Sequence, residues 1–188
     1  MISRVAVYCG SVPGTRPGYA AAARELGQEL AHRGIELVYG GGNVGLMGEL
    51  ADACLDIGGE VTGVIPRALV DREMAHPHLS RLEVVASMAQ RKALMEELSD
   101  AFIVLPGGIG TLEEFFQVAT RQQLGPEPGP VGFYNVDGFW TPLLEMLRHL
   151  VAEGFYPQKY VDAFVVAQSG GALLDGLENW VSPGRKWE

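Results

Sequence analysis

Apolar residues along this chain follow two alternating patterns. Short runs rich in Val, Ile, Leu and aromatic residues have the length and the bounding turns of buried strands. These runs are Val5–Cys9, Glu36–Tyr39, Val61–Ile65, Leu82–Val85, Ala101–Leu105, Val131–Tyr134 and Phe164–Ala167. Together they predict a sheet of about seven strands.

Between these runs, apolar residues recur at three- and four-residue spacing, which predicts amphipathic helices. The helical segments are Tyr19–Arg33, Leu46–Ile57, Met88–Leu98, Leu112–Leu124, Thr141–Glu153 and Ala172–Trp180. Gly34, Gly58 and Gly154 follow three of them, as is common at helix C-termini. The alternation predicts an α/β fold, with a mainly parallel sheet covered by helices on both faces. Ligands of such sheets bind beyond the carboxyl ends of the strands.

Length and charge narrow the class of protein. A chain of 188 residues with 47% hydrophobic content predicts one domain, which we expect over residues 1–181, followed by a tail at 182–188. The net charge of −9 argues against a nucleic-acid groove, so any bound phosphate should be small. Cys9 and Cys54 lie in apolar surroundings, which indicates buried thiols in a reducing compartment. With neither a leader pattern nor a long apolar run, we expect a cytoplasmic protein that binds no membrane.

The segment AFIVLPGGIGTLEEFF at 101–116 carries the strongest chemical signal. A buried strand feeds the glycine-rich turn Pro106–Gly110, which opens a helix whose first amides could bind an anion. Thr111 and Glu114 also have the T-x-x-E spacing of a capping box, in which the glutamate only satisfies the helix's own amides. From this segment alone, the phosphate site and the cap are equally supported.

Two other glycine-containing turns follow predicted strands. Gly40-Gly41-Gly42-Asn43-Val44-Gly45 matches G-x-G-x-x-G, but it follows the second strand, and the next strand ends without the acidic residue of a dinucleotide site. A turn that lines another nucleotide or a sugar is therefore favoured over an NAD(P) site, and Gly41 and Gly42 are candidate contacts. Gly10 and Ser11, after the first strand, suit either close approach to a ligand or an ordinary turn.

An arginine interrupts the apolar face of the helix predicted at Met88–Leu98. Ser87 and Gln90 form an S-x-x-Q capping box, so the helix begins there and Arg91 falls within its first two turns. Arg91 shares one face with apolar side chains, and a guanidinium that points inward needs an anionic partner. That partner is either a bound ligand or, in the structural alternative, Asp100 or a glutamate.

Taken together, these residues resemble the LOG family, the cytokinin-activating phosphoribohydrolases formerly described as lysine decarboxylases. Residues 106–114 read as its P-G-G-x-G-T-x-x-E motif and residues 88–92 as its M-x-x-R-K motif. Further matches extend through most of the chain: Tyr39–Gly42, Gly45–Gly48, Gln123–Gly125, Asn135–Phe139 and Glu153–Phe155.

The resemblance implies a Rossmann-like homodimer that hydrolyses the N-glycosidic bond of a nucleoside 5′-monophosphate to the free base and ribose 5-phosphate. By motif position, Arg91 and Glu114 are implied to be catalytic. The residues implied to bind substrate are Glu73, Met88, Lys92, Gly107, Gly108, Ile109, Gly110, Thr111, Leu112, Glu113 and Thr120. Ala89 and Arg121 stand where plant members usually have histidine and tryptophan, which leaves the preferred base open.

The residue types suit this chemistry. A carboxylate such as Glu114 can stabilise an oxocarbenium-like transition state while it orients or activates water. Glu113 projects about 100° away on the helix, so the two glutamates cannot act as a pair on one sugar carbon. Gly107–Thr111 would hold the 5′-phosphate, while Arg91 either clamps that anion or positions Glu114 and the ribose.

Neither a metal nor a cofactor is expected. The histidines show no four-ligand spacing, and Lys92 is poorly placed for the Schiff base that a pyridoxal-phosphate decarboxylase requires. A non-catalytic nucleotide-binding or carrier protein remains the alternative, because the same glycine turns would serve it.

Overall fold

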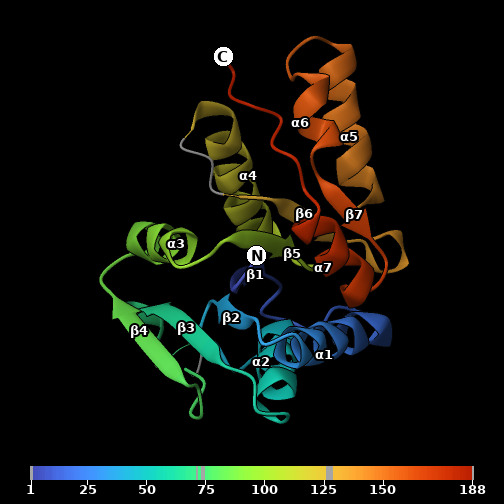
Figure 1. Ribbon diagram of the computed structural model, residues 1–188. Helices are drawn as coiled ribbons and strands as arrows, with labels where there is room; N and C mark the ends of the chain where they lie inside the picture. Colours follow the sequence, from blue (N-terminus) through green and yellow to red (C-terminus); the bar gives the residue numbers. More distant parts are fainter. Residues whose placement is uncertain (1, 71, 73–74, 126–128, 188) are drawn as a thin grey trace.

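The computed structural model describes residues 2–70, 72, 75–125 and 129–187. Its centre is a seven-stranded sheet with the order β4-β3-β2-β1-β5-β6-β7, in which every neighbouring pair is parallel (Figure 1). The strands are β1 (Arg4–Tyr8), β2 (Glu36–Tyr39), β3 (Val61–Pro66), β4 (Arg81–Val85), β5 (Ala101–Val104), β6 (Val131–Tyr134) and β7 (Val165–Ala167). The predicted α/β class and mainly parallel sheet are confirmed.

Helices connect the strands and cover both faces of the sheet. They are α1 (Pro17–His32), α2 (Gly45–Leu55), α3 (Met88–Glu97), α4 (Ile109–Leu124), α5 (Thr141–Ala152), α6 (Gln158–Asp162) and α7 (Gly170–Glu178). Short 3₁₀ turns lie at Arg67–Leu69 and Val136–Gly138. All six predicted helices are present; α6 was not predicted, because five residues are too few to show a helical period. Within the described part of the chain, none of the helices has both the length and the apolar character needed to cross a membrane.

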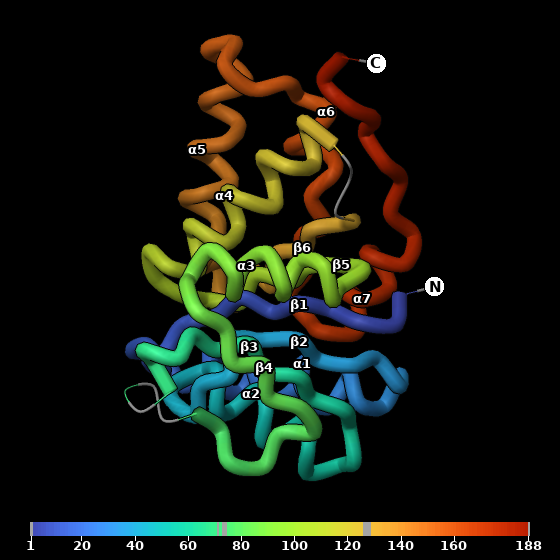
Figure 2. Tube along the Cα trace, turned by 90° about the vertical axis from the view of Figure 1, so that its left-hand side faces the viewer, coloured from blue at the N-terminus to red at the C-terminus, as the bar shows by residue number. Residues whose placement is uncertain are grey.

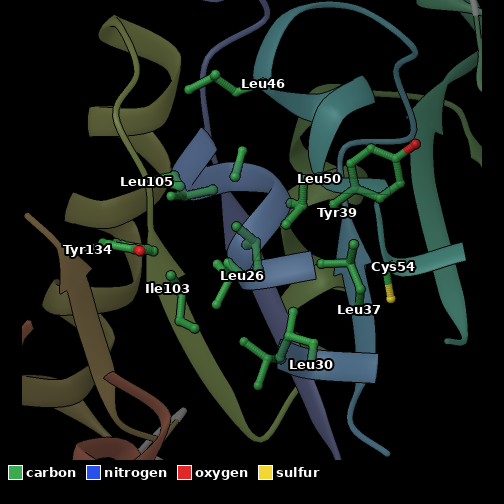
Figure 3. Close-up of a cluster of buried hydrophobic side chains, with 14 of the residues drawn as sticks. Leu26, Leu30, Leu37, Tyr39, Leu46, Leu50, Cys54, Ile103, Leu105 and Tyr134 are labelled. Atoms are coloured by element: carbon green, nitrogen blue, oxygen red, sulfur yellow. The ribbon is translucent and has the colours of Figure 1, made fainter. Parts of the chain in front are cut away.

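One face of the sheet packs against α1, α2 and α7 through an aliphatic core. In Figure 3, Leu26 and Leu30 of α1 lie between Ile103 of β5 and Leu37 of β2. The helices α1 and α2 approach each other closely at Gly27, where an added Cβ would lie 2.4 Å from the backbone oxygen of Leu50. Glycine is therefore required at this crossing, since any side chain would push the two helices apart.

The opposite face packs against α3, α4 and α5, and its core is rich in aromatic rings. Phe115 of α4 contacts Phe133 and Phe164 with ring centroids 4.7 and 5.4 Å apart. The indole Nε1 of Trp140 donates to the carbonyl of Val104, 3.1 Å away at the end of β5. Figure 2 shows α3 lying between the part of the molecule that contains α1 and α2 and the part that contains α4 and α5.

The C-terminal segment runs back over the α4 side of the molecule (Figure 2). The amide of Lys186 donates to the carbonyl of Gln123, and Lys159 Nζ donates to the carbonyl of Arg185 at 3.0 Å. The expected tail thus makes hydrogen bonds to the body of the domain.

The topology places a crevice at the carboxyl ends of β1 and β5. These neighbouring strands lead to helices on opposite faces, α1 after β1 and α4 after β5. The connections therefore diverge at this point, which is where ligands bind in open α/β sheets.

Candidate active site

A cavity of about 320 Å³ opens at the carboxyl ends of β1 and β5. It brings together ten of the residues that the sequence predicted: Gly10, Ser11, Met88, Arg91, Gly108, Ile109, Gly110, Thr111, Glu113 and Glu114. Cys9, Val12 and Met47 also line it and were not predicted as site residues. The only sequence signal for Met47 was its place in the Gly45–Gly48 match. The volume is in the range of small-molecule sites.

The N-terminus of α4 forms one wall of this cavity. The helix begins at Ile109 with Gly108 as its N-cap, and no side chain caps it. The predicted capping box of Thr111 and Glu114 is therefore wrong, because both residues already lie inside the helix. A Cβ added at Gly108 or Gly110 would meet no atom within 4 Å. The first turn thus presents its amides to open space, the arrangement that binds anions.

Two glycine turns pack together behind this helix start. The amide of Gly10 donates to the carbonyl of Pro106 at 3.1 Å. A Cβ on Gly107 would lie 2.1 Å from Thr111 Oγ1 and 3.0 Å from the amide nitrogen of Gly10. Gly107 is therefore a spacer that lets the β1 and β5 loops meet, and its backbone lies behind the pocket wall instead of in it.

Arg91 enters the cavity from α3 with its side chain almost fully buried. Its Nε donates to the carbonyl of Val64 at 3.0 Å, and its Nη2 donates to the carbonyl of Gly40 at 2.9 Å. One carbonyl within β3 and one directly after β2 thus fix the guanidinium plane. The alternative pairing with Asp100 is wrong, because Asp100 Oδ2 accepts from Ser3 and from the amide of Arg4 at the amino-terminal ends of β1 and β5, away from the cavity.

Glu114 and Arg91 meet at a smaller cavity of about 20 Å³ beneath the main one. Tyr8, Cys9, Gly40, Met47 and Met95 complete most of its lining. A space of this size holds about one water molecule. A carboxylate, a guanidinium and room for water therefore lie together at the floor of the site.

Cys9 lies beside this pair but is held as a thiol. Burial raises the pKa of Cys9 strongly, the charge of Glu114 raises it further, and Arg91 opposes the shift. Because the thiolate is the nucleophilic form, Cys9 is unsuited to covalent catalysis at neutral pH.

The two neighbouring glutamates of α4 have different surroundings. Lys92 Nζ contacts Glu113 Oε1 at 2.5 Å, and the Glu113 side chain is 58% exposed. Glu113 thus lies at the rim of the pocket, whereas Glu114 also reaches the inner cavity. That the two carboxylates do not act as a pair on one sugar carbon stays a prediction, which these different surroundings support.

Several predicted contacts lie outside the pocket lining. Leu112 packs against the aromatic core, and the Thr120 hydroxyl donates to the carbonyl of Phe116 at 2.7 Å on the exposed side of α4. Gly41 and Gly42 are buried in the turn after β2, and Lys92 reaches the site only through Glu113. Glu73 lies outside the described residues.

A buried histidine holds the glycine turn after β2 in place. His76 donates its backbone amide to the carbonyl of Gly41 at 3.0 Å, and its Nε2 lies 2.9 Å from Asp52 Oδ1. The Nδ1 atom accepts from the amide of His78, so Nε2 carries the proton that Asp52 accepts. His76 therefore has a structural role, and the described residues contain no group of three or more His, Cys, Asp or Glu side chains that could hold a metal.

Comparison with known proteins adds a family and a fold. A family model described as "Possible lysine decarboxylase" matches residues 47–177. The cytokinin riboside 5′-monophosphate phosphoribohydrolase LOG of Oryza sativa subsp. japonica is 46% identical over 178 residues, covering 95% of this chain and 74% of the relative. A cytokinin riboside 5′-monophosphate phosphoribohydrolase of Arabidopsis thaliana is also 46% identical over 178 residues, with 95% and 84% covered.

Two solved structures share the architecture at much lower identity. A molybdenum cofactor carrier protein from Chlamydomonas reinhardtii superposes with a TM-score of 0.73 at 18% identity, covering 95% of this chain and 97% of the other. A molybdenum cofactor binding protein from Rippkaea orientalis gives 0.71 at 21% identity, with 95% and 96% covered. At such identities the likeness establishes the fold alone.

Proposed function

Since this chain belongs to the LOG family, we propose that it hydrolyses the N-glycosidic bond of cytokinin riboside 5′-monophosphates, releasing the free base and ribose 5-phosphate. The observation that carries the proposal is the shared cavity of Arg91 and Glu114 beside the uncapped N-terminus of α4. It offers an anion site and a carboxylate within one small pocket.

The N-terminus of α4 would hold the 5′-phosphate. Amides of the first turn and the partial positive charge of the helix dipole both favour an anion there. The first turn of α4 contains no acidic residue that would repel it. The phosphate then anchors the nucleotide with its ribose directed toward the floor of the cavity.

Glu114 would act on the ribose. As the bond from C1′ to the base nitrogen breaks, positive charge develops on the sugar, and a nearby carboxylate stabilises it. The same carboxylate can accept a proton from the attacking water. The water oxygen ends on C1′ and one of its protons ends on the departing base, so the reaction needs no cofactor.

Arg91 would keep the nucleotide in register with Glu114. Its Nε and Nη2 donors are occupied by the carbonyls of Val64 and Gly40, so the guanidinium cannot swing freely. A fixed cation on the wall of the pocket can contact the anionic substrate without reorganisation.

The decisive experiment is a chromatographic assay of base release. The protein is incubated with an N6-prenylated adenosine 5′-monophosphate and, separately, with adenosine 5′-monophosphate. Release of free base and ribose 5-phosphate supports the proposal, and the ratio of the two kcat/KM values identifies the preferred base. Tight nucleotide binding without base release would instead identify the non-catalytic carrier that the fold also permits.

The family resemblance also supports a homodimer, which we propose to form through α3 and α4. Met88, Ile109, Phe116 and Leu124 expose 42, 81, 43 and 48% of their surface on these two helices. Apolar side chains left exposed on two helices in this way suit an interface. Sedimentation velocity would show a dimer, and a fully active monomer would contradict this arrangement.

The cytoplasm is the compartment we propose. Both cysteines, Cys9 and Cys54, are free thiols, which suits a reducing environment. Fractionation of the source cells followed by immunodetection would test the location.

A further inference from the structure

A buried carboxylate links the two helices that carry the proposed catalytic residues. Glu96 of α3 has a side chain that is 1% exposed, and it accepts hydrogen bonds from two residues of α4. Gln117 Nε2 donates to its Oε1, and Arg121 Nη1 donates to its Oε2. These three residues are called the α3–α4 bridge below.

The bridge and the site share one face of α4 and lie at adjacent positions of α3. On α4, Gln117 and Arg121 follow Glu114 by three and seven residues, which places all three on one face. On α3, Met95 immediately precedes Glu96 and lines the small cavity together with Arg91. The bridge therefore joins α3 and α4 about one helical turn from Glu114 and next to Met95, a residue that lines the small cavity.

Electrostatics also couples the bridge to the cavity. Burial raises the pKa of Tyr8, which lines the small cavity, and the charges of Glu114 and Glu96 raise it further, while Arg121 opposes them. The bridge thus lies close enough to act on the polar floor of the site.

Packing alone gives no reason to bury a carboxylate here. Replacing a buried ion pair by apolar residues of similar volume is often neutral or stabilising. Hydrogen bonds do have one property that apolar contacts lack, since they fix direction and register. A hydrogen-bonded bridge of this kind suits a place where the relative position of two helices matters more than the strength of their packing.

We propose that Glu96 is a positioning residue that fixes α4 against α3 and thereby sets the Arg91–Glu114 geometry for N-glycosidic hydrolysis. The inference rests on the proposed function for its kinetic consequence. Its structural part, that Glu96 fixes the packing of α3 against α4 beside the small cavity, stands independently.

The first test compares Glu96→Leu with Glu97→Leu. Both variants remove a carboxylate from α3, but Glu97 is exposed on the solvent side of the helix. For Glu96→Leu we expect kcat to fall about tenfold or more with KM within about twofold, because small misplacements of reacting groups are costly. Glu97→Leu should match the wild type. A folded Glu96→Leu protein with normal kcat, or with a change in KM alone, would overturn the inference.

The second test is a rescue. The double variant Glu96→Gln, Gln117→Glu exchanges the amide and the carboxylate, so a hydrogen bond between the helices and a partner for Arg121 are both kept. We expect its kcat to return to within about threefold of the wild type, because the cross-helix link is restored. A double variant as slow as Glu96→Leu would show that helix positioning is not the cause of the loss.

The third test does not need enzymatic activity. Labelling of Cys9 by a thiol reagent, followed by peptide mass spectrometry to separate it from Cys54, reports opening of the cavity floor. We expect labelling to be about tenfold faster in Glu96→Leu and unchanged in Glu97→Leu, because Cys9 lies on that floor. Unchanged Cys9 labelling would refute the inference even if the wild type releases no base, an outcome that would refute the proposed function separately.

Discussion

The two faces of the sheet are built from the same strands but bury different kinds of side chain. The face covered by α1 and α2 buries mainly aliphatic, small and sulfur-containing side chains, together with Tyr19, Tyr39 and Tyr134. The face covered by α3 and α4 buries Arg91, Glu96, Thr111 and Gln122 among its aromatic rings. The charged side chains of Arg91 and Glu96 are thus buried on the side that carries the site.

The difference shows how a small domain separates stability from chemistry. Buried charges destabilise unless each finds partners, so a site needs a scaffold that is secure elsewhere. Here the close contact of α1 with α2 supplies that scaffold, and α2 contributes the apolar side chain of Met47 to the pocket. Substitutions on the two faces should therefore have separable effects on activity and stability.

The largest effect should come from removing the phosphate of the substrate, which tests the α4 side alone. If the uncapped start of α4 binds the 5′-phosphate, adenosine should have a kcat/KM roughly a thousandfold or more below that of its monophosphate, since binding energy at that group is used at the sugar. Steady-state kinetics with the two substrates measures this ratio. Comparable turnover would show that the helix start does not hold phosphate.

A somewhat smaller effect is expected for Glu114→Gln, which changes charge with little change in shape. Loss of the carboxylate should lower kcat by about a hundredfold or more and leave nucleotide affinity and Tm nearly unchanged. Glu113→Gln is the matched control at the pocket rim and should be milder on kcat. A Glu114→Gln protein with normal turnover would disprove the assigned role.

The apolar face is tested by Gly27→Ala, which should change stability and leave the kcat of the folded protein intact. The new Cβ would lie 2.4 Å from the Leu50 oxygen, and relieving that clash should cost about 1–3 kcal/mol of unfolding free energy. Gly171→Ala is the control, because its Cβ meets nothing closer than 3.6 Å. Denaturant unfolding measures both variants, and an equal response would contradict the close-packing argument.

The smallest effect is expected for Asp100, which lies at the amino-terminal ends of the strands, away from the active-site cavity and from the α1–α2 contact. Burial tends to raise the pKa of Asp100, but hydrogen bonds from Ser3 and Arg4 outweigh it and leave the pKa below its ordinary value. A depressed pKa stabilises the fold above the unfolded-state pKa, and that contribution is lost as pH falls through the folded-state value. Asp100→Asn should cost less than about 1 kcal/mol near neutrality.

The pH dependence provides the check for Asp100. The stability gap between Asp100→Asn and the wild type should narrow as the pH is lowered below the ordinary carboxyl range. Thermal unfolding of both proteins at several pH values measures this difference in stability. A difference that does not change with pH would show that the effect comes from packing and not from the charge of Asp100.

The sequence predicted elements well wherever a pattern extended over a full strand or several helical turns. Apolar spacing placed the start of α4 at Leu112, and the T-x-x-E alternative made Thr111 a cap, whereas the structure begins the helix at Ile109 with Gly108 as N-cap. Ser87 was predicted correctly as a cap, since its hydroxyl accepts from the amide of Gln90. Local signals thus decided one helix start and misled at the other.

The site was predictable in its motif residues and less so in their partners. The sequence pointed to an anionic partner for Arg91 and gave no sign of its hydrogen bonds to the carbonyls of Val64 and Gly40. Val64 and Gly40 are far from Arg91 in the sequence. A backbone carbonyl is present at every residue, so the side-chain pattern cannot show which carbonyls will accept a hydrogen bond. The bridging role of Glu96 was hidden for the same reason, because it depends on how α3 and α4 are set side by side.

The contact between Gly40 and Arg91 ties the two positions together under mutation. A Cβ at position 40 would lie 2.0 Å from Arg91 Nη2, so no other residue fits there while the arginine stays in place. In a saturation library, substitutions at 40 should be scored as lethal for activity in the native background and become tolerable for folding once position 91 carries a smaller side chain. Once Arg91 is replaced, a larger residue can be accepted at position 40. That residue then occupies the space of the guanidinium, so the arginine cannot be regained until glycine is restored at position 40.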